Sequence, residues 1–304
     1  MQKTIVNLVV LFTFVVLQPK ASFAALIKVS DHVYSYADTK DPSPANSFGA
    51  NAGVIVTDEG LIVIDTLISA KEAQRFIADI KEISNQPFKY AVNTHYHLDH
   101  SFGNAEFKKL GAVIISQEKD RGALAEKGEE ILKDASTYGL TPEEMEGTEI
   151  AVPSLSFEKA VSIELGGVLV KLIYAGPSHS KGSLMVYVPQ EKVLFAGDIL
   201  FTDYHPYMAD GVVAGWLTVL DYISTLDVTA IVPGHGPLST QKDIADMKDY
   251  LLAFDTKARE LAKKKATPEE LAVELKAALP VRSWLDWVIA VNLKALYLPE
   301  AKAE

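Results

Sequence analysis

Three histidines and one aspartate lie within six consecutive positions, in the pattern His95-x-His97-x-Asp99-His100. The whole chain has only seven histidines, so their density here is unusual. Neutral imidazole and ionised carboxylate are the usual protein ligands of zinc and neighbouring transition metals. Four such groups exceed what one tetrahedral zinc takes from a single segment, so the pattern predicts two metal ions rather than a solvated polar turn.

Three further residues of the same types follow apolar, strand-like runs. His179 lies in a loop of small residues, and Asp198 and His235 each come directly after a glycine. Glycine lets the backbone approach an ion closely and adopt a positive φ angle. Taken singly, these residues could be a surface histidine, a turn aspartate and a capped loop histidine. Together with the first cluster, they predict one shared metal site built on strand ends.

The elements that must position these residues are short strands in two successive halves of the chain. Each half has several strands before its helix, which favours a mixed, largely antiparallel sandwich of sheets flanked by helices over a regular alternating βα barrel. The expected strands are residues 33–36, 53–57, 61–65, 88–92, 112–115, 161–165, 168–174, 184–188 and 193–195.

Helices are expected between and after these strands. Apolar residues at helical spacing predict an amphipathic helix over 69–83 and a helical tail after Pro237. A Thr-Pro-Glu-Glu signature, with threonine as cap and proline at the first position, predicts helix starts at Thr141 and Thr267. The tail is expected to pack on the main domain, which gives a metal-binding domain over 25–238 and a helical C-terminal extension over 239–304.

Residues 1–24 have the composition of a secretory signal peptide. A short basic start is followed by an apolar run of 14 residues and then by the small residues before Ala24. A membrane anchor needs about 20 apolar residues, so cleavage after Ala24 is the expected outcome. Because the chain has no cysteine for lipid attachment, we expect a periplasmic or secreted protein without stable membrane association.

Composition excludes several other kinds of chemistry. The absence of cysteine rules out disulfides, thiolate metal ligands and a cysteine nucleophile. Without residues 1–24, 27 basic residues stand against 40 acidic ones, a net charge of −13. This charge repels phosphate backbones, so nucleic acid is not an expected partner and a small-molecule substrate is. The oligomeric state is left open.

The ordered set of candidate ligands resembles that of the metallo-β-lactamase superfamily, from about Val33 to Pro237. The resemblance implies an αββα sandwich with a dinuclear metal site at the sheet edge. It also implies how the ligands divide. The first metal would take His95, His97 and His179, the second would take Asp99, His100 and His235, and Asp198 would bridge the two.

The resemblance also implies a chemistry. Two cations that share a water lower its pKa toward neutrality, so that it attacks a carbonyl carbon without any protein nucleophile. Asp99 would orient that water as the catalytic residue. Asp65, at the end of a predicted strand, is similar to the family's buried carboxylate that orients the metal-binding histidines.

The substrate is less well specified. Asp198 and His100 make the chain similar to the glyoxalase II, lactonase and general hydrolase branches of the superfamily, rather than to the β-lactamases with a thiolate ligand. The loop over 204–210 is expected to overhang the site. Its Tyr204, His205 and Tyr207 would line a substrate pocket, or instead pack against the following helix.

The resulting prediction is a secreted dinuclear zinc hydrolase that cleaves an ester, lactone, thioester or amide bond, with β-lactams included. Ligands that are all nitrogen or oxygen would also accept iron or manganese. Two alternatives remain open: an iron-dependent oxygen or sulfur redox enzyme on the same fold, and a non-catalytic periplasmic accessory protein.

Overall fold

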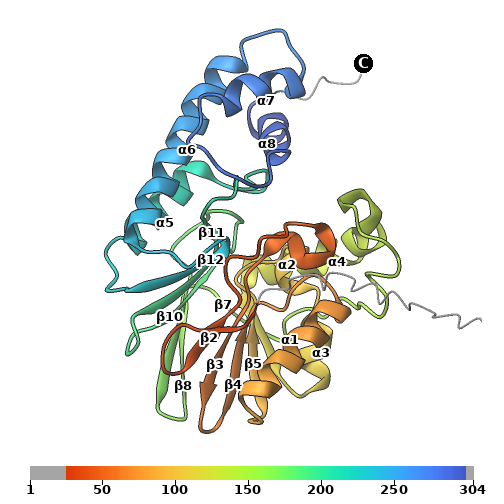
Figure 1. Cartoon of the computed structure of the whole chain (residues 1–304), viewed down its shortest axis with the longest axis vertical. Coiled ribbons are helices and arrows are strands. Elements are labelled where there is room, and N and C mark those ends of the chain that lie inside the picture. Colours follow the sequence, from red (N-terminus) through yellow and green to blue (C-terminus); the bar gives the residue numbers. More distant parts are fainter. Residues whose placement is uncertain (1–24, 299–304) are drawn as a thin grey trace, which may run out of the picture.

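The computed structural model describes residues 25–298 of the chain. Two sheets face each other and helices cover both outer faces, which confirms the predicted αββα sandwich (Figure 1). The predicted signal peptide lies outside the described residues. Within 25–298, every helix is too short or too polar to cross a lipid bilayer.

The first sheet has seven strands in sequence order. They are β1 (Ile27–Lys28), β2 (Val33–Ser35), β3 (Gly53–Thr57), β4 (Gly60–Ile64), β5 (Phe88–Val92), β6 (Val113–Gln117) and β7 (Leu155–Phe157). Strands β1 to β4 pair antiparallel, whereas β4 to β7 pair parallel. Because parallel strands end at the same edge of a sheet, the residues that follow β4 and β5 lie side by side.

The second sheet has five strands in the order β12-β11-β10-β9-β8. They are β12 (Ala230–His235), β11 (Val193–Phe201), β10 (Met185–Val188), β9 (Val168–Ile173) and β8 (Ala160–Leu165). Strand β11 is parallel to β12 and runs well beyond its predicted end at Phe195, with register shifts on both sides of Gly197. These irregularities let β11 continue through Asp198 to the edge of the sheet.

The helices form two groups, and the first group also includes two short 3-10 turns. The first group is α1 (Ala70–Ile83), α2 (Leu98–Ser101), α3 (Asn104–Lys109) and α4 (Glu118–Lys133), with turns η1 (Pro44–Gly49) and η2 (Ala135–Tyr138). The second is α5 (Val213–Ile223), α6 (Gln241–Leu261), α7 (Pro268–Lys276) and α8 (Val288–Leu296). The Ser69 side chain caps the predicted helix α1 by accepting a hydrogen bond from the Glu72 amide at 3.2 Å.

One apolar core joins the second sheet to the C-terminal helices. Trp216 of α5, Phe254 of α6, Leu275 of α7 and Leu293 of α8 are all fully buried in it. A second core fills the space between the two sheets, and a third lies under α1 and α3. The domain boundary predicted at residue 238 falls between β12 and α6, and the helices beyond it pack on the sandwich.

The two predicted helix starts have different outcomes. Thr267 caps α7 with reciprocal hydrogen bonds to Glu270, as expected. At Thr141 the same pair of bonds forms with Glu144, but residues 142–147 are turns and the prediction of a helix is wrong. Gly147, at φ +73°, ends the segment, and Met145 is the one buried residue in 142–147. A helical cap alone therefore does not produce a helix.

Candidate metal centre

The seven predicted ligands meet at the edge of the sandwich, although four separate stretches of chain supply them. These stretches are the segment after β5 with the start of α2, the β9–β10 loop, β11, and the end of β12. In that order they carry His95, His97, Asp99 and His100; His179; Asp198; and His235. Six of the seven are buried, and the side chain of His97 is only 12% exposed.

The first group of potential ligands contains His95, His97, His179 and one oxygen of Asp198. Nε2 of His179 lies 2.8 Å from Nδ1 of His97 and 3.3 Å from Oδ2 of Asp198. Nε2 of His95 lies 3.7 Å from the same oxygen. Three imidazole nitrogens and a carboxylate oxygen therefore surround one small space.

The second group contains Asp99, His100 and His235. Oδ2 of Asp99 lies 3.4 Å from Nε2 of His100 and 3.3 Å from Nε2 of His235. The other oxygen of Asp198, Oδ1, lies 3.1 Å and 3.5 Å from the same two nitrogens. Asp198 thus directs one oxygen to each group, which is the arrangement expected of a bridging ligand.

The donor atoms fit a pair of divalent cations. A tetrahedral zinc with bonds of about 2.0–2.1 Å separates its ligand atoms by roughly 3.3 Å, close to the separations between these atoms. Within the described residues, Nε2 of His95, Nε2 of His100 and Oδ1 of Asp198 are buried without a hydrogen-bond partner. Because burying such atoms without a partner is costly, their convergence indicates a cation that completes them.

The histidine pKa values differ between the two groups of potential ligands. Burial lowers the pKa of His95 well below its usual value and that of His179 to about 3, so both imidazoles are neutral and able to coordinate. Burial also disfavours charge on His235, but the carboxylates of Asp198 and Asp99 outweigh it and raise its pKa to about 9. Without metal, protons therefore collect in the second group, and a cation that binds there must displace them.

Asp65 lies directly behind the second group, where its buried carboxylate makes three hydrogen bonds. Oδ2 accepts from Nδ1 of His100 at 2.9 Å and from the Thr94 hydroxyl at 2.8 Å, and Oδ1 accepts from the Thr94 amide at 2.7 Å. These bonds fix the His100 ring with Nε2 toward Asp99 and Asp198. The structure thus places Asp65 against one histidine of the site.

A second carboxylate, Asp210, has the same relationship to the first group and was not identified in the sequence. Its Oδ2 lies 3.0 Å from Nε2 of His97 and accepts a hydrogen bond from the Tyr96 hydroxyl at 2.6 Å. The bond to His97 holds the pKa of Asp210 well below its usual range. Asp210 belongs to the loop expected to overhang the site, but no spacing pattern distinguishes it from other loop aspartates.

Asp120, near the start of α4, connects two of the ligand-bearing loops. Its Oδ2 accepts hydrogen bonds from the Tyr96 amide at 3.2 Å and the Ser180 hydroxyl at 2.6 Å. These partners are the immediate neighbours of His95 and His179. The segment that contains this buried carboxylate had looked only charged and helical in the sequence.

Two of the three predicted pocket residues lie behind the site. The Tyr204 hydroxyl donates to the Thr39 carbonyl at 2.7 Å, and Nδ1 of His205 lies 2.7 Å from the Tyr250 hydroxyl. Both residues are 1% exposed, because Tyr204 is directed toward the N-terminal segment and His205 toward α6 instead of facing solvent. Tyr207, the third, does line the cavity, and its carbonyl lies 3.0 Å from Nδ1 of His179.

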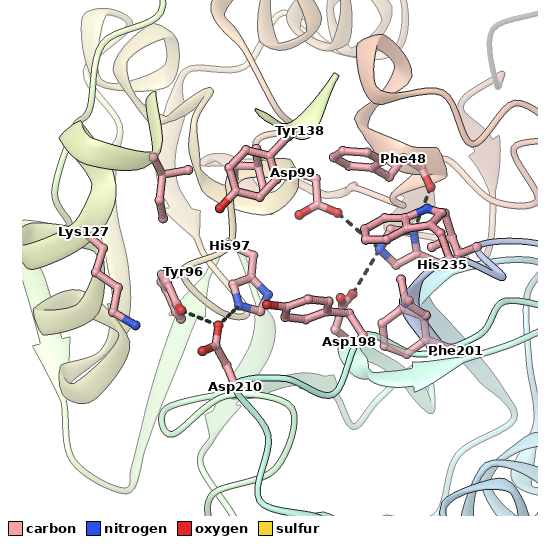
Figure 2. Close-up of a pocket in the computed structure, with 16 residues that line it drawn as sticks. Phe48, Tyr96, His97, Asp99, Lys127, Tyr138, Asp198, Phe201, Asp210 and His235 are labelled. Carbon is pink, nitrogen blue, oxygen red and sulfur yellow. Dashed lines mark hydrogen bonds and ion pairs between the residues drawn. The ribbon is translucent and has the colours of Figure 1, made fainter. Parts of the chain in front are cut away.

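A cavity of about 290 Å³ opens above both ligand groups. Figure 2 shows Lys127 and Tyr96 at one side, Phe48 beside His235 at the other, and Asp99 between them. The walls come from η1, α4, η2, the loop after β11 and the segment that leads into α8. Among the described residues that line it, Lys127 is the one lysine or arginine. The cavity is therefore an apolar space with a polar floor.

Comparison with known proteins finds curated relatives that match this chain over about half of their own length. The linear primary-alkylsulfatase of Pseudomonas sp. (strain ATCC 19151) is 26% identical over 262 residues, which cover 73% of this chain and 49% of that protein. The 2,4-dinitroanisole O-demethylase subunit alpha of Nocardioides sp. (strain JS1661) is 27% identical over 180 residues, 59% of this chain and 50% of that subunit. The chain thus spans about half the length of the curated relatives it matches.

Solved structures share the fold at low sequence identity. A metallo-β-lactamase from Pontibacter korlensis has a TM-score of 0.62 and 20% identity, covering 75% of this chain and 99% of that one. VMB-1 has a TM-score of 0.59 and 22% identity, with 76% and 97% covered. The family model for the metallo-β-lactamase superfamily matches residues 45–235, which include all seven candidate ligands. The chain belongs to the metallo-β-lactamase superfamily.

Proposed function

We propose that this protein is a dinuclear metal-dependent hydrolase that cleaves an ester, lactone, thioester or amide bond in a small molecule. The observation that carries the proposal is the position of Asp198, whose two oxygens face two separate groups of ligands at the floor of one cavity. A shared carboxylate holds two cations close together. Bound cations of this kind supply an acidified water as nucleophile and polarise the bond to be broken.

The residues of the chain prepare this reaction. Burial by itself raises the pKa of Asp99, but the imidazoles of His100 and His235 hold it well below its usual range. Asp99 therefore remains ionised at the cavity floor, where it accepts a hydrogen bond from the attacking water and orients it. Asp65 and Asp210 keep His100 and His97 in the ring orientations that leave their other nitrogens free for coordination.

Zinc is the proposed metal, with His95, His97 and His179 at one ion, Asp99, His100 and His235 at the other, and Asp198 at both. The nitrogen-rich donor set supports zinc, although iron and manganese accept the same ligands. Metal analysis of protein purified with and without air tests this choice. Stoichiometric iron and no hydrolysis with zinc would favour the redox alternative.

We also propose that the protein acts in the periplasm or outside the cell. The signal-like composition of residues 1–24 supports this location, and the net charge of −13 that remains without them argues against nucleic-acid partners. Fractionation of cells that express the full chain, with mass spectrometry of the mature N-terminus, tests the location. A product that begins at Ala25 is the expected result.

The deciding experiment for the reaction is a hydrolysis panel on zinc-reconstituted protein. It covers carboxylic esters, lactones, thioesters, β-lactams and phosphoesters, and compares wild type with Asp99→Asn. Asp227→Asn, a change in an exposed carboxylate paired with Lys192, is the matched control. We expect turnover by wild type and control and a loss of at least 100-fold in Asp99→Asn. Turnover that is equal in all three proteins contradicts the proposal.

A second candidate reaction is hydrolysis of an alkyl sulfate ester. Two observations favour it: the 26% identity to a linear primary-alkylsulfatase, and the presence of Lys127 on an otherwise acidic and apolar cavity. An ammonium group at the rim attracts an anionic substrate. An alkyl sulfate added to the panel tests this reaction, with Lys127→Met expected to raise KM and Lys192→Met, distant from the cavity, expected to leave it unchanged.

A further inference from the structure

The mouth of the cavity beside the second ligand group is lined by two aromatic side chains that contact each other. Phe48 comes from η1, and Trp287 comes from the segment between α7 and α8. Their ring centroids lie 6.4 Å apart at an interplanar angle of 52°. Leu285 and Val288 continue the wall on the side of Trp287. Two segments more than 200 positions apart in the sequence thus form one apolar wall over the metal-ligand site. The part of the cavity along this wall is called the slot.

The backbone on both sides of this slot is strained. Ser47 and Phe48 both have φ +52°, and Leu285 has φ +63°. Such left-handed conformations are unfavourable for a residue with a side chain, and they persist where the surrounding structure imposes them. Here the left-handed residues Phe48 and Leu285 have side chains that line the cavity instead of packing in the core.

Hydrogen bonds to the loop after β11 hold the Trp287 side of the slot in place. The Trp284 carbonyl accepts from the His205 amide at 2.9 Å, and the Ser283 hydroxyl donates to Asp203 at 2.8 Å. Buried Asn292 of α8 donates to the Pro206 carbonyl at 2.8 Å. The wall is therefore preformed, and a ligand does not have to order it before binding.

Trp287 is nevertheless 53% exposed. A large aromatic side chain that is half exposed at the edge of a cavity is stabilised when an apolar group covers it. Exposure alone does not mark a binding surface, since Val273 on the outer side of α7 is 74% exposed. The position of Trp287 distinguishes it: the wall it forms leads directly to His235 and Asp99 at the cavity floor.

From this arrangement we infer that the substrate carries an extended apolar group, an alkyl chain or a hydrophobic ring, that packs against the paired rings of Phe48 and Trp287 while its scissile bond lies over Asp99 and Asp198. The inference rests on the proposed hydrolase function and adds the class of substrate. Trp287 is the specificity-determining residue in this scheme, and no metal ligand changes when it is replaced.

Trp287 is a better test position than Phe48. The Phe48 carbonyl lies 3.2 Å from Nδ1 of His235, so a substitution in that strained turn disturbs a proposed ligand as well as the slot. Trp287 is exposed, and its replacement removes surface without leaving an internal cavity. Trp287→Ala removes the wall, Trp287→Phe keeps an aromatic wall, and Val273→Ala controls for loss of an exposed apolar group elsewhere.

The experiment measures kcat/KM of the zinc-loaded protein on p-nitrophenyl acetate and octanoate. A fully buried methylene contributes about fourfold, so we expect the octanoate to exceed the acetate by at least about tenfold. Trp287→Ala is expected to lower this ratio about tenfold. Trp287→Phe and Val273→Ala are expected to keep it within about threefold. A ratio that is the same in wild type and Trp287→Ala overturns the inference.

A binding measurement separates this inference from the proposed reaction. Calorimetric titration of chelator-treated protein with 1-octanol, which needs no turnover, is expected to give a Kd about tenfold weaker in Trp287→Ala than in wild type or Val273→Ala. If no ester is hydrolysed but octanol binds in this way, the hydrolase proposal fails and the slot stands. If esters are hydrolysed but the Kd for octanol is the same in wild type and Trp287→Ala, the inference about the slot is wrong and the hydrolase proposal is retained.

Discussion

Oδ2 of Asp210 lies 3.0 Å from Nε2 of His97, and this contact determines how His97 faces the site. An ionised carboxylate can only accept, so Nε2 of His97 donates and carries the ring proton. Nδ1 is then unprotonated and points toward Nε2 of His179, 2.8 Å away. A carboxylate outside the ligand set thus selects the tautomer of a proposed ligand.

Replacing Asp210 with asparagine is expected to weaken the first metal site. The amide cannot supply the negative charge that stabilises the His97 N–H, and loss of such a partner typically lowers metal affinity 10- to 100-fold. Titration with zinc against a chromophoric chelator measures the affinity of each site. Equal affinities in wild type and Asp210→Asn would contradict this role.

Asp65→Asn is the corresponding change at the second site. Asp65 has φ +60°, a conformation that asparagine also tolerates, so the variant removes charge without adding backbone strain. We expect the site that contains His100 to lose affinity by a similar factor, while the site that contains His97 keeps its own. A loss at the same site in both variants would show that the two carboxylates do not act separately.

Gly234→Ala is expected to damage both sites at once. A Cβ atom at this position would lie 1.9 Å from Oδ1 and 2.7 Å from the amide nitrogen of Asp198, so the bridging carboxylate must move. Overpacking of this kind costs about 1–3 kcal/mol of unfolding free energy. Metal content and urea denaturation measure the two effects.

Gly122→Ala is the matched control for that change. Gly122 lies within α4, and a Cβ there has no neighbour within 4 Å. Alanine is the better helix former by about 1 kcal/mol, so this variant should be more stable than wild type and retain its metal. Full metal binding by Gly234→Ala would show that Asp198 has room to move.

His205 makes stability depend on pH in a defined direction. Burial lowers its pKa to about 4, although the Asp286 carboxylate, 3.1 Å from Nε2, opposes the shift. The unfolded state, with a pKa near 6.5, binds the proton more readily, so stability falls as pH decreases from about 6.5 to 4. The contribution is at most about 3 kcal/mol.

The measurement compares unfolding free energies at pH 7 and pH 4.5 in chelator-treated wild type and His205→Gln. The variant should be less stable at pH 7 and show a smaller decrease between the two pH values, because glutamine does not titrate. The other titrating groups, the metal-site histidines included, are common to both proteins. An equal decrease in both would mean that protonation of His205 is not linked to folding.

Removing metal should lower stability measurably. Nε2 of His95, which is buried without a hydrogen-bond partner among the described residues, gains a partner when a cation is bound. Free metal at 100 times its Kd stabilises the folded state by about 2.7 kcal/mol. Chelation is therefore expected to lower Tm, and excess zinc should restore it. A Tm that does not respond to chelator and zinc would contradict metal binding at this site.

Local sequence patterns were enough to identify the candidate metal ligands. The motif from His95 to His100 follows a strand recognisable by its apolar run, and Asp65 follows the neighbouring parallel strand, so their meeting at one sheet edge could be expected. The same reasoning placed Asp198 near the end of a strand, although β11 in fact continues through it to Phe201.

Side chains whose role depends on distant partners could not be read in this way. Asp210 meets a histidine 113 positions earlier, and Phe48 meets Trp287 across most of the chain. Periodicity records which face of an element is buried and says nothing about what lies opposite. For the same reason the sequence left open whether Tyr204 and His205 line the cavity or pack inward, and the structure shows both buried, bonded to the Thr39 carbonyl and the Tyr250 hydroxyl.

The Trp287 side of the aromatic slot lies on a part of the chain that carries none of the proposed metal ligands. All seven proposed ligands precede Pro237, while Trp287 and its neighbours belong to the connection between α7 and α8. Mutations in that connection can therefore alter which molecules enter without changing any atom that would hold a metal. This separation lets substrate range diverge between related proteins while the proposed metal ligands are inherited intact.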